Sequence, residues 1–123
     1  TIIPGFVTKD GRPQMSFGVM GGNMQPQGHV QTLVRMLVHG QQPQAACDAP
    51  RWKVGSGLNV DFESTMAPAL LQGLKDLGHR FEPTPDAYMD FGSGQFIWRL
   101  SDDMEAGYVA ASDSRRDGQA VGF

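Results

Sequence analysis

The first twenty residues alternate between apolar and polar side chains and predict a β-hairpin. Residues 1–8 form one apolar, β-rich run, and residues 13–20 form a second run in which every other side chain is apolar. Alternation with a period of two is typical of a strand that buries one face. Between the two runs, Asp10 and Gly11 supply the positive φ angles that a tight hairpin turn needs.

After this hairpin the pattern changes to the period of an α-helix, and it predicts an amphipathic helix from Gly28 or His29 to Gly40. A single apolar stripe is typical of a helix that packs one face against a core. The stripe recurs at i, i+3, i+4, i+7 and i+8 and consists of Val30, Leu33, Val34, Leu37 and Val38. We therefore expect this stripe to be buried.

A second helix is expected from a cap at Ser64 or Thr65 to Leu77. Its apolar face comprises Met66, Leu70, Leu71, Leu74 and Leu77. The remaining pattern predicts a short helix over 43–49, a hairpin of 51–54 with 58–62, strands over 79–82, 95–100 and 107–112, and an irregular segment over 83–94. Strands that come in hairpins around two principal helices indicate an α+β fold with mainly antiparallel strands, not a series of βαβ units.

Length and composition narrow the classes of protein. The 123 residues fit a single domain spanning 1–123, because no linker-like segment divides them. The formal net charge is −3, and no basic run carries interleaved aromatic residues, so we expect no nucleic-acid partner. No apolar stretch approaches the ~20 residues needed to span a bilayer, so we expect no membrane partner.

The reactive side chains are not spaced for a metal site or a nucleophile motif. His29, His39 and His79 form no HxxxH or HxxE pair, so no metal ligand set is predicted. Cys47 is the only cysteine and has no nearby histidine, which indicates a buried, inert thiol. No serine lies in a GxSxG-type motif.

The Gly21-Gly22 pair stands between the second predicted strand and the first predicted helix. Backbone N–H groups at such a point can hold a phosphate, a carboxylate or a developing oxyanion. Glycine can equally serve only the geometry of a tight strand-to-helix connection. The residues by themselves leave both interpretations open.

Four segments, IPGFVTKDGRP, VMGGNMQPQGHVQ, DAPRW and AASDSRRDG, resemble in this order the gamma-glutamyltransferase (gamma-glutamyltranspeptidase) family, especially its acylase-like, transferase-like branch. Nearly the whole chain is similar to the C-terminal, small-subunit part of such a protein. The resemblance implies an N-terminal-nucleophile hydrolase fold, which is an αββα sandwich of two antiparallel sheets between helical layers. It also implies that the intact parent is a transferase or amide hydrolase that needs no cofactor.

The resemblance gives roles to a few residues. Gly21 and Gly22 match the paired glycines whose N–H groups stabilise the oxyanion of the tetrahedral intermediate in this family. Asn23 follows them as a substrate contact or as a residue that stabilises its own turn. Thr1 takes the place of a serine that helps to hold the substrate carboxylate.

The nucleophile that the resemblance implies is a threonine upstream of this segment, freed by self-cleavage. Thr1 is followed by Ile2-Ile3-Pro4 and does not match the T-T-H-x-S-V type of sequence that begins at this nucleophile. We therefore expect a chain that is inactive alone and that needs the upstream large-subunit portion of the same protein to act on a small-molecule amide. The alternatives are a non-catalytic α+β interaction module and a hydrolase that uses Thr1 itself.

Two further expectations concern packing. Asp113 and Arg115, which match the family's A-S-D-P-R block, are expected to tie the C-terminal tail to the sheet by ion pairs. A partial sandwich also exposes apolar faces that the rest of the enzyme covers, so we predict that the isolated chain self-associates.

Overall fold

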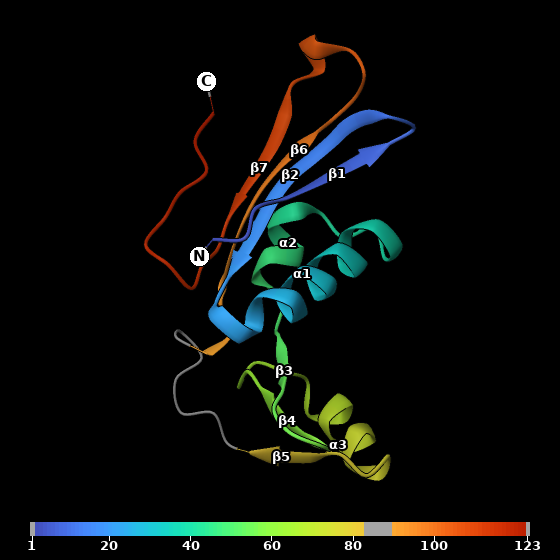
Figure 1. Cartoon of the computed structure of the whole chain (residues 1–123), viewed down its shortest axis with the longest axis vertical. Coiled ribbons are helices and arrows are strands. Elements are labelled where there is room, and N and C mark those ends of the chain that lie inside the picture. Colours follow the sequence, from blue (N-terminus) through green and yellow to red (C-terminus); the bar gives the residue numbers. More distant parts are fainter. Residues whose placement is uncertain (1, 83–89, 123) are drawn as a thin grey trace.

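The computed structural model describes residues 2–82 and 90–122, and its strands form two sheets (Figure 1). The larger sheet has the strand order β1-β2-β6-β7, and the smaller sheet has the order β3-β4-β5. The strands are β1 (Gly5–Lys9), β2 (Arg12–Met20), β3 (Trp52–Val54), β4 (Asn59–Phe62), β5 (Arg80–Glu82), β6 (Ser93–Arg99) and β7 (Tyr108–Ser112). The helices are η1 (Gly22–Met24), α1 (Gln25–Leu33), the π-helical turn η2 (Val34–Val38), α2 (Pro43–Asp48), α3 (Pro68–Asp76) and η3 (Met104–Ala106).

The predicted N-terminal hairpin is confirmed. β1 and β2 pair antiparallel across a turn at Asp10 and Gly11, whose φ angles are 52° and 75°. Asparagine, aspartate and glycine tolerate such angles better than other residues, which is why this pair ends one strand and starts the next.

β2 is longer than β1 and pairs along its other edge with β6. This second pairing runs as far as Met20 opposite Ser93. The end of β2 and the start of β6 therefore lie side by side. The strand predicted over 95–100 thus begins earlier, at Ser93, because β2 supplies a partner for those residues. Of the predicted irregular segment, residues 83–89 lie outside the described part.

α1 and α2 cover one face of the four-stranded sheet (Figure 1). The side chains between them form the main core, which comprises Met15, Phe17, Val19, Met36, Ala46, Cys47, Phe96 and Ala111. The predicted alternation of β2 is therefore correct, and the short helix predicted over 43–49 is α2.

The opposite face of this sheet also carries apolar side chains, and these are exposed. Phe6, Ile97 and Tyr108 point away from the helices, and more than half of each residue's surface remains accessible, at 61%, 52% and 54%. The predicted exposure of an apolar strand face is thereby confirmed.

The prediction for the first helix was wrong about its buried face. Val30, Val34, Leu37 and Val38 are 58%, 40%, 50% and 71% exposed. Of the predicted stripe only Leu33 packs at the edge of the core, and Met36, which was expected to widen the stripe, is buried in the core. The residues that α1 buries are Gln25, Gly28, Gln31 and Thr32. The helix also begins at Gln25, with Pro26 in its first turn, and ends in the π-helical turn η2.

Two kinds of contact explain this inversion. Gly28 lets α1 approach β2 so closely that a Cβ atom there would lie 2.6 Å from Cγ1 of Val19. Gln31 forms two hydrogen bonds with the backbone of β3, accepting from Trp52 N–H at 3.0 Å and donating to Trp52 C=O at 2.8 Å. The polar face of α1 thus joins the two sheets, and most of its apolar stripe is left exposed.

The small sheet departs from the expected pattern of hairpins in one place. β3 and β4 form the predicted antiparallel hairpin, but β5 pairs parallel with β4 after the chain has crossed through α3. A parallel neighbour requires such a crossover. α3 begins after Ala67, with Pro68 in its first turn, and has no side-chain cap from Ser64 or Thr65. Its predicted apolar face is only partly covered: Met66 is buried and Leu71 and Leu74 are half-buried, whereas Leu70 and Leu77 are 51% and 79% exposed.

Candidate active site: the glycine loop and its support

The glycine loop, residues 21–24, turns the chain from the end of β2 into α1. Gly21 has φ 139° and Gly22 has φ 57°, which are backbone angles that side chains with a Cβ atom rarely adopt. The loop is closed by a 3.0 Å hydrogen bond from Met24 N–H to Gly21 C=O. The predicted strand, glycine turn and helix are therefore present, with a short 3₁₀ turn (η1) before the helix.

Two N–H groups of this loop, those of Gly21 and Gly22, face no acceptor within the described residues. Gly22 and Asn23 are exposed and Gly21 is half-buried. The two N–H groups also stand at the amino end of η1 and α1, where the helix dipole favours negative charge. The loop therefore has the donors and the polarity to hold an anion or an oxyanion.

His29 supports the end of β2 from the first helix. Its Nε2 accepts a 3.1 Å hydrogen bond from Val19 N–H, which lies beyond the part of β2 that pairs with β1, since that pairing stops at Phe17. Its ring lies 4.8 Å from that of Phe17. Burial lowers the pKa of His29, so the imidazole is neutral at pH 7 and can accept this bond.

The glycine loop rests against the backbone of residues 91–94. A Cβ atom on Gly21 would lie 2.8 Å from Cα of Gly92. A Cβ atom on Gly92 would overlap the carbonyl oxygen of Met20, and Gly92 itself has φ 69°. Both positions therefore need glycine, and two backbone segments far apart in sequence meet here in direct contact.

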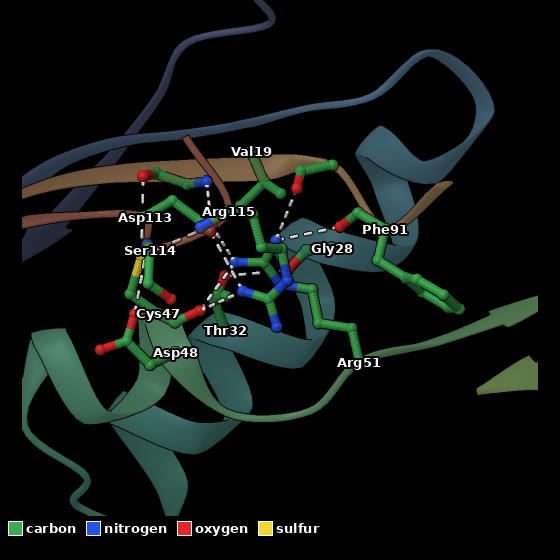
Figure 2. Close-up of polar contacts among 12 residues, drawn as sticks. Val19, Gly28, Thr32, Cys47, Asp48, Arg51, Phe91, Asp113, Ser114 and Arg115 are labelled. Atoms are coloured by element: carbon green, nitrogen blue, oxygen red, sulfur yellow. Dashed lines mark hydrogen bonds and ion pairs between the residues drawn. The ribbon is translucent and has the colours of Figure 1, made fainter. Parts of the chain in front are cut away.

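A buried cluster of ionised side chains forms hydrogen bonds to the backbone of residues 91–94 (Figure 2). Arg51 and Asp113 are 1% and 0% exposed, and Arg51 Nη2 lies 2.6 Å from Asp113 Oδ2. Burial alone would raise the pKa of Asp113, but the charge of Arg51 and the N–H groups of Gly94 and Arg115 outweigh it and hold the pKa below its ordinary value. Asp113 is thus ionised at neutral pH.

Arg115 extends the cluster toward the second sheet. It donates to both oxygens of Glu63, at 2.6 and 2.5 Å, and to Asp113 Oδ1 at 3.1 Å. Burial alone would lower the pKa of Arg115, but the hydrogen bonds and charges of Glu63 and Asp113 raise it above its usual range. The predicted ion pairs of Asp113 and Arg115 are therefore confirmed.

Cys47 lies inside the same cluster and is inert. It is fully buried, with Sγ 3.6 Å from Asp113 Oδ2 and from the Gly94 carbonyl oxygen. Burial and the charge of Asp113 raise the pKa of this thiol to about 12. A thiolate nucleophile at neutral pH is excluded, as the sequence predicted.

The structure brings together some predicted site residues and adds others. Gly21, Gly22 and Asn23 form one loop, whereas Thr1 lies outside the described residues. Ile2, next to it, passes over Gly18 of β2, where a Cβ atom would lie 3.4 Å from the Ile2 carbonyl oxygen. The sequence interpretation missed the surroundings of this loop, which include Gly92 in direct contact and the buried Arg51 beyond it. The available signals were the place of Arg51 in the DAPRW segment and the Gly92-Ser93-Gly94 turn.

Two further classes of site are absent from residues 2–82 and 90–122. These residues contain no group of three or more His, Cys, Asp or Glu side chains that could hold a metal ion. None of their helices is both long enough and apolar enough to cross a membrane.

Comparison with known proteins gives this geometry a family context. The family model for gamma-glutamyltranspeptidase matches residues 1–123. The chain is 36% identical over 128 residues to the glutathione hydrolase-like YwrD proenzyme of Bacillus subtilis (strain 168), covering 100% of this chain and 24% of that protein. It is 33% identical over 119 residues to the oxamate amidohydrolase proenzyme of Klebsiella pneumoniae, covering 93% of this chain and 22% of that protein.

Solved structures show the same arrangement of elements. Cephalosporin acylase from Bacillus halodurans matches with a TM-score of 0.85 and 44% identity, over 94% of this chain and 21% of that chain. A gamma-glutamyltranspeptidase from Pseudomonas nitroreducens matches with a TM-score of 0.80 and 22% identity, over 100% of this chain and 61% of that chain, which shows a shared fold. The α+β fold is thus part of the N-terminal-nucleophile hydrolase sandwich, as the resemblance implied.

These matches also show how much of a relative the chain represents. It spans about a quarter of the length of the curated relatives it matches, at 24% and 22%. The matched relatives are named as hydrolases, an acylase and a transpeptidase. The chain belongs to the gamma-glutamyltranspeptidase family.

Proposed function

We propose that this chain is the C-terminal part of an enzyme that transfers or hydrolyses the acyl group of a small-molecule amide, and that Gly21 and Gly22 form its oxyanion hole. The observation that carries the proposal is the glycine loop. It holds two N–H groups without an acceptor among the described residues, at the amino end of a helix and on a rigid backbone support. A donor of this kind is worth about 3–4 kcal/mol of barrier.

The proposed reaction needs a nucleophilic hydroxyl, which we assign to a threonine upstream of this segment. Its oxygen attacks the amide carbonyl carbon and its proton passes to a base. The carbonyl oxygen becomes an oxyanion, which the N–H groups of Gly21 and Gly22 stabilise. The intermediate then expels the amine, which takes up the proton, and water or an acceptor amine releases the acyl group. The names of two relatives end in "proenzyme", which fits a nucleophile freed by cleavage.

The substrate is proposed only as a class. The relatives are named for glutathione, oxamate and cephalosporin, so an amide of a small molecule is the common element that we carry over to this chain. We propose Asn23 as a substrate contact because its side chain is exposed beside the two glycines. Thr1 is proposed as a second contact from its place in the sequence.

The first test is hydrolysis of a gamma-glutamyl anilide by the full-length gene product and by this chain alone. We expect activity in the full-length product and none in the chain, because the nucleophile is absent from it. Activity of the isolated chain that disappears in Thr1→Ala would overturn this assignment and make Thr1 the nucleophile. A full-length product that cleaves neither this anilide nor simple amides would refute the proposed activity.

The role of the glycines is tested by the matched variants Gly22→Ala and Gly11→Ala in the full-length product. Both glycines have positive φ, and the space that an added methyl group would fill is open at both, so both variants lose about 1–2 kcal/mol of stability from backbone strain. Only Gly22→Ala re-aims the proposed donors, and we expect its kcat to fall by about tenfold or more. Equal kcat values for the two variants would refute the oxyanion role.

We further propose that the rest of the parent enzyme covers the open face of the four-stranded sheet. The exposed row of Phe6, Ile97 and Tyr108 supports this proposal, because an apolar sheet face of this kind marks an interface. The isolated chain should then self-associate. Sedimentation across the micromolar range measures this, and a clean monomer would contradict it.

A further inference from the structure

We infer that Arg51 is a positioning residue for the glycine loop: it fixes the backbone of Phe91 and Gly92, and this backbone fixes Gly21. The inference rests on the proposed function only in its kinetic consequence. Its structural content is that a guanidinium buried behind the loop sets the direction of the loop's N–H groups. Arg51 is far from the loop in sequence and has no role in the mechanism proposed above.

The first link joins Arg51 to the segment before β6. Arg51 Nη1 donates to the carbonyl oxygens of Phe91, at 2.9 Å, and Gly92, at 3.2 Å (Figure 2). These carbonyl groups are buried, so an unpaired one would be unfavourable. One side chain therefore satisfies two consecutive backbone acceptors and holds them in a fixed orientation.

The second link joins this segment to the glycine loop. Gly92 lies against the backbone of both Met20 and Gly21, at the end of β2. A Cβ atom added to Gly92 would overlap the Met20 carbonyl oxygen, and a Cβ atom added to Gly21 would lie 2.8 Å from the Gly92 Cα. Backbone atoms in such contact cannot move independently. A shift of Gly92 therefore moves Gly21.

The third link fixes Arg51 itself. Its Nη2 donates to Asp113 Oδ2 at 2.6 Å and to the Cys47 carbonyl oxygen at 2.9 Å. The same Asp113 oxygen accepts from Gly94 N–H at 2.6 Å. One ion pair thus holds residues 91–94 from both of its members. Arg51 binds the carbonyl groups of Phe91 and Gly92, and Asp113 binds the N–H group of Gly94.

Arg115 provides a natural control within the same cluster. It shares the Asp113 carboxylate and the Cys47 carbonyl oxygen with Arg51, at 3.1 and 2.9 Å, but its remaining partners are Glu63 and the Ala49 carbonyl oxygen. It makes no recorded contact with residues 91–94 in the described part. Weakening Arg115 disturbs the cluster without releasing Phe91 and Gly92.

The test compares Arg51→Lys with Arg115→Lys in the full-length gene product. A lysine keeps the charge but cannot hold two carbonyl groups and a carboxylate in the geometry of a guanidinium. We expect both variants to lower the melting temperature. Arg51→Lys should lower kcat by about tenfold or more with KM changed by less than about twofold, whereas Arg115→Lys should keep kcat within about twofold of the parent. Equal losses of kcat per folded molecule in both variants would overturn the inference.

A second measurement separates this inference from the proposed function. Hydrogen exchange of the Met24 amide, which bonds to Gly21 C=O, reports the closure of the loop without any substrate. We expect faster exchange in Arg51→Lys than in Arg115→Lys, and equal rates would overturn the inference. A full-length protein that hydrolyses no amide refutes the proposed activity but leaves this exchange test in force.

Gly92→Ala serves where Arg51→Lys does not give folded protein. Its methyl group overlaps the Met20 carbonyl oxygen and displaces the loop while Arg51 keeps its charge partner. We expect the same pattern, a lower kcat with a nearly unchanged KM and faster exchange of the Met24 amide. Parental values of both quantities in Gly92→Ala would show that the contact does not position the loop.

Discussion

The two sheets of this chain differ in how their helices pack. α1 approaches β2 of the four-stranded sheet closely through Gly28. By contrast, no residue of α3, which leads into the small sheet, is buried. The buried ion pair of Arg51 with Asp113 is bonded to residues 91–94 at the start of β6 in the large sheet, whereas the ion pair of Lys53 with Asp61 in the small sheet is partly exposed. The candidate site stands on the densely packed half, where a shift in one segment is transmitted to the next.

The largest expected effect comes from breaking the ion cluster with Asp113→Ala. This change leaves Arg51 buried without its carboxylate and should lower the free energy of unfolding by about 3–5 kcal/mol. Asp61→Ala in the small sheet should lower it by less than about 1 kcal/mol. Urea unfolding of both variants measures the difference, and similar losses would contradict the contrast between the sheets.

A glycine-to-alanine substitution is expected to have a smaller effect on stability, with opposite signs in α1 and α3. Gly28→Ala places a methyl group 2.6 Å from Val19 Cγ1 and should destabilise the protein by about 1–2 kcal/mol. Gly73→Ala in α3 meets no atom within 4 Å and should stabilise it by about 0.5–1 kcal/mol, because alanine favours a helix. Thermal melting of both variants gives the signs. A stabilising Gly28→Ala would show that α1 does not need the close approach.

The smallest effect concerns pH. The pKa of His29 is lowered from 6.5 by burial in the folded protein, so below about pH 6.5 the unfolded chain takes up a proton that the folded chain does not. The free energy of unfolding should therefore fall as the pH drops from 7.5 to 5.5, and His29→Gln should weaken this fall. An equal fall in His29→Gln and in the parent would contradict this prediction. The loss of stability from Asp113, whose pKa is also lowered, comes only at more acidic pH.

Local sequence determined the elements of this fold well. The Asp10-Gly11 turn, the alternation of β2 and the positions of α2 and β7 follow from short-range patterns, because turn angles and strand alternation depend on neighbouring residues. The position of the glycine loop between a strand and a helix was also found from sequence, although its role was left open by the residues alone. The resemblance to the gamma-glutamyltranspeptidase family then gave the loop its proposed chemistry.

The periodicity of the first helix did not determine which face is buried. It identified the apolar stripe correctly, but the helix packs through Gly28 and joins β3 through Gln31. A glycine that permits close approach and a glutamine that replaces a strand partner both look polar or neutral in a hydrophobicity pattern. Their contribution to packing depends on partners in β2 and β3, which a pattern within the helix does not contain.

The sequence by itself therefore determined the turns, most strands and the family, and only the tertiary structure decided what supports the candidate site. Arg51 and Asp113 lie 62 residues apart, and Gly92 belongs to a third segment. No local pattern relates these three residues, because they come together only when β6 pairs with β2 on one edge and with β7 on the other. The physical reason is that burial of charge is favourable only where the partner and the backbone acceptors already stand in place.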